Sequence, residues 1–104
     1  MSRAKGIRKP CDQTRARQRL VDARQFLEAA ELLDAPDVVA TNAIHASIAA
    51  ADAITCSALG ERSADSDHGA AVDLLRQVDA SLAAALKRSL DRKTQAAYES
   101  DDIS

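Results

Sequence analysis

The chain has 104 residues and a formal net charge of −2, and alanine supplies 23 of its positions, whereas it has one Phe, one Tyr and no Trp. A chain of this length forms one domain with a modest core. Three Gly and two Pro leave little material for the turns of an all-β fold, and alanine is depleted in strands. The composition therefore predicts an all-α fold with closely packed helices.

Positive charge is concentrated at the N-terminus. The first 24 residues contain eight Lys or Arg and two acidic residues, whereas the remainder contains six basic and fourteen acidic residues. A basic segment of this kind can contact nucleic acid, dock on the acidic body of another subunit, or simply be solvated. The sequence leaves these alternatives open, and the solvated tail is the simplest of them.

The cysteine content and the lack of a targeting segment predict a cytoplasmic protein. Cys11 and Cys56 are too few for a disulfide framework, which favours a reducing compartment. We expect no membrane partner, because no apolar run of membrane-spanning length stands out and no hydrophobic segment follows the N-terminal charges. An Arg-rich transit peptide remains an alternative.

The apolar spacing predicts two helices in the first part of the chain. Residues 1–11 have no apolar period and are expected to form a flexible basic arm. A first helix, capped by Asp12 or Thr14, runs to Leu33. Its predicted inward positions are Ala16, Leu20, Ala23, Phe26, Leu27, Ala30 and Leu33. Pro36 separates it from a second, central helix over residues 38–59.

The remaining chain is expected to form two further helices. A third helix starts near Asp67, and Asp79 offers a second cap, so a break is predicted near residues 78–80. One continuous helix over residues 67–97 is the alternative. Residues 99–104 form a frayed tail. The predicted architecture is an up-and-down four-helix bundle over residues 12–98.

The turn between the second and third helices carries the strongest chemical signal. Residues 59–68 bring Arg, Ser, Asp and His together, and Gly60 marks the end of the preceding helix. Arg62 offers a planar fork for phosphate, and His68 in a first helical turn can act as a general base. The pair could therefore cleave a phosphodiester without a metal. In the alternative interpretation, Arg62 pairs with an aspartate and His68 is half-exposed.

A polar stripe on the second helix could support this pair. Asn42, His45, Asp52 and Cys56 lie at spacings that project them on one side of a helix. They either hydrogen-bond inside the bundle or face the same cleft as Arg62, which is a candidate partner for a buried Asp52. The ligand spacing does not suit zinc, and we expect no metal or other cofactor.

Four segments give the chain a resemblance to the HEPN superfamily of small helical domains. They are residues 26–33, 42–54, 62–68 and 90–98. The family pattern is an Arg followed, after four to six residues, by a His, and five residues separate Arg62 from His68. The sequence departs from that pattern at Ser63, where Asn, Asp or His is common, and at His45 and Ala46, where aromatic residues are usual. It also ends where many members continue.

The resemblance implies both a fold and a function. It implies a metal-independent endoribonuclease of a toxin–antitoxin or defence system, in which Arg62 stabilises phosphate and His68 transfers protons. The supporting residues would be Asp52, Ser63, Asp67 and His45. The implied partners are a second copy of the chain, RNA and a cognate toxin or antitoxin. The alternative is a non-catalytic HEPN-like dimerisation, antitoxin-like or nucleotide-binding module.

Overall fold

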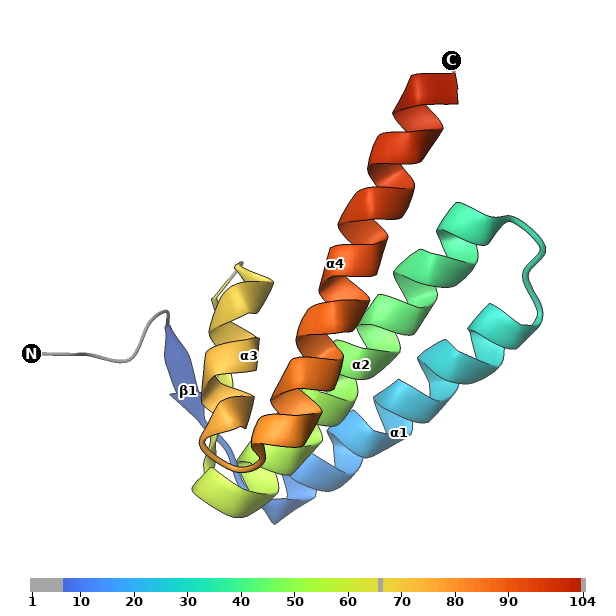
Figure 1. The fold of residues 1–104 in the computed structure, drawn as a ribbon. Coiled ribbons are helices and arrows are strands. Elements are labelled where there is room, and N and C mark those ends of the chain that lie inside the picture. The colour runs from blue at the N-terminus through green and yellow to red at the C-terminus, as the bar shows by residue number, and fades with distance from the viewer. Residues whose placement is uncertain (1–6, 66, 104) are drawn as a thin grey trace, which may run out of the picture.

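The fold is mostly helical, which confirms the predicted all-α character. A computed structural model describes residues 7–65 and 67–103, with side chains described up to residue 91. Within these residues the chain forms four helices and two short strands (Figure 1). In chain order the elements are β1 (Arg8–Pro10), α1 (Gln13–Glu31), α2 (Pro36–Leu59), β2 (Glu61–Ser63), α3 (His68–Arg76) and α4 (Ala80–Ile103).

Local chemistry sets the ends of the first two helices. The Asp12 side chain accepts a hydrogen bond of 2.9 Å from the backbone N–H of Arg15 and so caps α1. Helix α2 begins at Pro36, two residues before the predicted start, because proline is well suited to the first helical position, where its missing N–H costs nothing. The helix ends at Gly60, whose φ of +71° favours glycine and whose N–H donates to the Cys56 carbonyl.

Two aspartates cap the last two helices at their N-termini, as predicted. The Asp67 side chain accepts from the backbone N–H of Gly69 at the start of α3. The Asp79 side chain accepts from the N–H of Leu82 at the start of α4. The predicted break near residues 78–80 is therefore confirmed, and the alternative of one continuous helix is wrong. Helix α4 continues to Ile103, beyond the predicted end at residue 98.

Helix α2 is the central element, as predicted, because it contacts all three of the other helices and β2. In Figure 1, α1 and α4 flank α2, and α3 lies beside α4. The apolar core lies where α2, α3 and α4 meet. Its buried members are Ala51, Ala71, Val72, Leu75, Ala83 and Leu86, with Ile48, Ile54 and Leu90 packed against them. Small side chains let these helices approach closely.

Helix α1 does not contribute its leucines to this core as predicted. Its buried residues are Ala16, Ala23 and Ala30, which repeat every seven positions. Leu20 and Leu27 are 42% and 52% exposed. The physical reason is that α1 packs mainly against α2, so one narrow alanine row makes the contact and the neighbouring leucines stay at its edge.

The N-terminal segment forms a strand, which corrects two expectations. Residues 1–6 of the predicted arm lie outside the described residues, but β1 pairs antiparallel with β2, and Lys9 lies directly opposite Arg62. The predicted helix-to-helix turn therefore contains a strand. Gly60 turns the chain out of α2, and the extended backbone that follows finds its hydrogen-bond partners in β1. No local spacing could indicate this pairing, because it joins segments more than fifty residues apart.

Helix α2 also corrects the expectation about apolar length. By length and composition it is apolar enough to cross a membrane. The sequence prediction that no such run exists is wrong on this criterion. In the fold, the same helix packs against α1, α3 and α4 and carries the buried carboxylate of Asp52.

Candidate functional site

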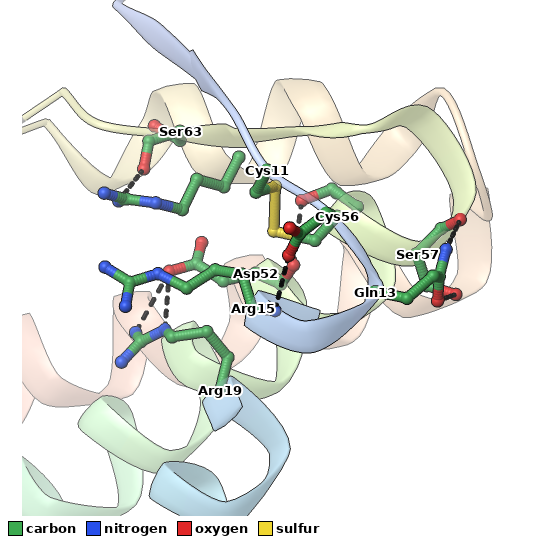
Figure 2. The surroundings of a disulfide bond; sticks show 11 residues. Cys11, Gln13, Arg15, Arg19, Asp52, Cys56, Ser57 and Ser63 are labelled. Atoms are coloured by element: carbon green, nitrogen blue, oxygen red, sulfur yellow. Dashed lines mark hydrogen bonds and ion pairs between the residues drawn. A yellow bond between two sulfur atoms is a disulfide. The ribbon is translucent and has the colours of Figure 1, made fainter. Parts of the chain in front are cut away.

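A disulfide bond between Cys11 and Cys56 joins the N-terminal segment to α2 (Figure 2). The sequence indicated only that two cysteines are too few for a disulfide framework, and the structure nevertheless pairs them. Cys56 is 1% exposed on the inner side of α2, and the Cys11 N–H donates a hydrogen bond of 2.9 Å to the Gly60 carbonyl. That backbone contact brings the two Cα atoms to 5.4 Å, within the normal range for a disulfide. The number of cysteines could not reveal this geometry.

Asp52, one helical turn before Cys56, holds an ion pair with α1. The Arg19 Nε and Nη2 atoms lie 3.1 and 3.0 Å from Oδ2 of Asp52, which is only 5% exposed. Arg19 also donates from Nη1 to Asp22 at 3.0 Å. The buried carboxylate therefore has the partner that its burial requires. That partner is Arg19, and not Arg62 as the sequence suggested.

Positive charges from two elements, α1 and β2, act on the Asp52 carboxyl. Burial raises its pKa, and the positive charges of Arg19, Arg62 and Arg15 oppose that effect, with Arg19 the strongest. The pKa of Asp22 is lowered instead, first by the hydrogen bond from Gln18 and then by Arg19. Asp52 thus lies at a point where the fields of three guanidinium groups overlap.

We define the Asp52 cluster as Arg15, Arg19, Asp22, Asp52 and Arg62. Figure 2 shows the Arg15 and Arg19 side chains extending side by side toward Asp52. The two residues are one helical turn apart on α1, so they share a face. With three arginines and two aspartates, the cluster carries one excess positive charge. Among the described side chains, neither Arg15 nor Arg62 forms an ion pair with a carboxylate.

A fourth cation adjoins the cluster through the sheet. Lys9 on β1 and Arg62 on β2 are directly opposed, so their side chains leave the sheet on the same face. Like charges in such a pair repel one another. Among the described residues, neither Lys9 nor Arg62 forms an ion pair with a carboxylate. A bound anion between or beside them would relieve this repulsion.

The structure places the two residues of the predicted catalytic pair in different environments. Arg62 is half-buried, and its Nη1 donates weakly to the Ser63 carbonyl at 3.5 Å. His68 is exposed as the first residue of α3. No hydrogen bond links Arg62 to His68 among the residues described. Two supporting residues have local roles instead: Ser63 Oγ accepts from the Asp65 N–H, and Asp67 caps α3.

The predicted polar stripe on α2 is divided between two environments. Asp52 and Cys56 are buried near the sheet. His45 is exposed and stacks on Phe26 of α1 with ring centroids 5.2 Å apart. The Asn42 amide donates to the Val38 carbonyl within the same helix. The stripe therefore does not line one cleft.

An open, mainly apolar groove of about 480 Å³ lies between α1 and α2. Its walls include Leu20, Ala53 and Ile54, and Arg17 is the one ionisable residue among those that line it. Such a surface suits an apolar partner more than a charged one. Charge-based chemistry in the described chain is concentrated at the Asp52 cluster.

Sequence reasoning missed Arg15 and Arg19. The four-residue spacing of these two arginines on a predicted helix indicated that they share a face. It could not indicate that both approach Asp52, because this depends on how α1 packs against α2. No protein-family model matches the chain, and comparisons with curated proteins and with solved structures find no match.

Proposed function

We propose that this chain is a non-catalytic, HEPN-like helical module that binds the phosphate groups of RNA through the Asp52 cluster and Lys9. The observation that supports the proposal is the overlap of three guanidinium groups on one buried carboxylate, with Arg15 and Arg62 unpaired by carboxylates in the described chain. A guanidinium presents a planar set of donors that matches phosphate oxygens.

The three arginines of the Asp52 cluster have different roles in the proposed binding. Arg19 is committed to Asp52 and Asp22, so it holds α1 in place against α2. Arg15 and Arg62 then provide donors from two different elements, and Lys9 adds a point charge from a third. Cations that come from one helix and two β-strands are spread over the surface. They can contact successive phosphates along an RNA chain better than they can converge on a single phosphate group. This spread favours RNA over a mononucleotide.

The test is binding of a fluorescein-labelled single-stranded RNA measured by anisotropy. We expect Arg15→Ala and Arg62→Ala each to weaken binding on the order of tenfold, because each removes a phosphate contact. Arg24→Ala is the matched control, since it removes the same charge from an exposed position of α1 outside the cluster. Equal losses in all three variants would show that net charge alone drives binding and would overturn the proposal. A mononucleotide competitor tests the choice of ligand.

A metal-independent endoribonuclease is the second candidate. It is favoured by the exposure of His68 and by the contact between β2, which carries Arg62, and α3, which begins at His68. Incubation with mixed RNA in EDTA, alongside His68→Ala, tests it. His45→Ala is the matched control, because His45 is also exposed but lies elsewhere on α2. Cleavage lost only in His68→Ala would replace the non-catalytic proposal.

Self-association belongs to the same proposal. The half-exposed leucines of α1 and the apolar groove beside them support a homodimer. Sedimentation velocity across a concentration series tests it, and Leu20→Lys should shift the equilibrium toward monomer. A single monomeric species at all concentrations would contradict it. A cognate toxin or antitoxin and a cytoplasmic location remain predictions from the sequence.

A further inference from the structure

We infer that the Cys11–Cys56 disulfide is a redox latch for the phosphate-binding surface: oxidation holds β1 beside β2, and reduction releases β1 and weakens RNA binding. The inference rests on the proposed function and adds its regulation. Cys11 lies directly after β1, and Cys56 lies one turn after Asp52 on α2. The bond therefore joins the strand that carries Lys9 to the helix that carries the centre of the cluster.

Strand β1 has little else to hold it. It is three residues long and pairs with one partner, and a two-stranded sheet is marginal by itself. Its ion pair, Arg8 with Glu61 at 3.6 Å, is partly solvated and so contributes little. The buried Nε of Arg8 has no hydrogen-bond partner, and the Lys9–Arg62 pair is repulsive.

The rest of the fold does not share this dependence. Helix α1 packs along α2 through its alanine row, and Arg19 joins the two helices by an ion pair. Both contacts lie outside β1. Reduction is therefore expected to free residues 7–10 while the helices stay packed. Arg15 and Arg19 would remain in place, whereas Lys9 would leave and Arg62 would lose the strand opposite it.

The bond is placed for exchange with a thiol reductant. Cys56 is 1% exposed and Cys11 is half-buried, so the thiolate of a reductant such as glutathione is expected to attack the Cys11 sulfur. A mixed disulfide forms at Cys11 as the Cys11–Cys56 bond breaks, and Cys56 leaves as a thiolate that takes up a proton. A second reductant thiol attacks the reductant sulfur of the mixed disulfide and frees Cys11, which also takes up a proton. Two electrons and two protons reach the cysteines, and the two reductant thiols become a disulfide.

The neighbouring charges favour this route. Asp52, on which the positive charges of Arg19, Arg62 and Arg15 act, lies one turn before Cys56 on α2, and positive charge in the neighbourhood stabilises a leaving thiolate. A disulfide in a cytoplasm is usually transient or redox-sensing rather than permanent. The predicted location and the observed bond are thus compatible if the bond opens and closes.

The test compares oxidised and reduced protein in the anisotropy assay, with the thiol state fixed by glutathione buffers and measured by alkylation and mass spectrometry. We expect reduction to weaken RNA binding on the order of tenfold and reoxidation to restore it. The Cys11→Ser/Cys56→Ser variant should bind as weakly as reduced wild type and ignore reductant. Equal affinity in both states, or a bond that millimolar reduced glutathione leaves intact, would overturn the latch.

A second readout separates failure of the latch from failure of the proposed function. The Ala64 N–H donates to the Ile7 carbonyl, and the Cys11 N–H donates to Gly60. Hydrogen exchange at both amides should accelerate on reduction, whereas amides within α2 should stay protected. If the oxidised protein binds no RNA, the proposed function fails. The exchange data still test whether reduction releases β1. Unchanged exchange at both amides would show that β1 stays docked and would refute it.

Discussion

Two faces of α2 illustrate two different ways of holding a helix. The face that meets α3 and α4 is apolar, with Ala51 and its neighbours buried among leucine, valine and alanine. The face that meets α1 and the sheet carries an ion pair at Asp52 and a disulfide at Cys56. The first arrangement excludes water and has no charge to offer a ligand. The second retains unpaired cations near solvent, which is why we assign binding to it.

Removing the disulfide should have the largest effect on stability. Cys11→Ser/Cys56→Ser frees a loop that spans a sequence separation of 45 residues. The chain-entropy relation then gives a loss of about 4 kcal/mol in the free energy of unfolding. Urea denaturation of the oxidised protein and of the variant measures the loss. A change in the free energy of unfolding below about 1 kcal/mol would show that the charged face of α2, which carries Asp52 and Cys56, does not depend on the covalent link.

A cavity at the apolar face should cost slightly less. Leu75 is 2% exposed and belongs to the apolar core, so Leu75→Ala leaves a void that this alanine-rich core has few flexible side chains to fill. We expect a loss of about 3 kcal/mol by urea denaturation. RNA affinity under native conditions should stay within about twofold of wild type, because the apolar core and the cluster lie on different faces of α2. A larger loss of affinity would contradict the separation of the two regions.

The pH dependence of stability should distinguish the charged face of α2 by a smaller effect. Because burial raises the pKa of Asp52, the folded protein holds this proton at pH values where the unfolded chain has released it. The contribution of Asp52 to stability therefore falls as pH rises above 3.8, the ordinary pKa of the group, through its raised pKa. Asp22, whose pKa is lowered, acts in the opposite sense and only as pH falls below 3.8.

Asp52→Asn provides the comparison for this effect. Wild type should lose stability relative to the variant as pH rises above 3.8 through the raised pKa of Asp52, as measured by urea denaturation at each pH. The amide keeps an acceptor for Arg19 but does not titrate. Parallel curves for the two proteins would show that Asp52 ionises in the folded state as it does in the unfolded chain.

The sequence predicted the apolar region well and the charged region poorly. Helical spacing and capping aspartates located α2 and the break near residues 78–80, because these depend on residues close together in the chain. The disulfide, the strand pair and the Arg19–Asp52 ion pair depend on contacts across 33 or more residues. Arg62 and Asp52 were selected from the sequence as candidate site residues, whereas Arg15 and Arg19 were missed.

The most direct test of phosphate binding at the Asp52 cluster is the salt dependence of RNA affinity. The slope of log K against log salt counts the phosphates that a protein neutralises, at about 0.7 for each contact with a single strand. Removing Arg15 and Arg62 together should make the slope shallower by about 1.4, while Arg24→Ala/Arg88→Ala keeps the wild-type slope. Equal slopes for wild type and the Arg15→Ala/Arg62→Ala variant would place the RNA elsewhere on the molecule.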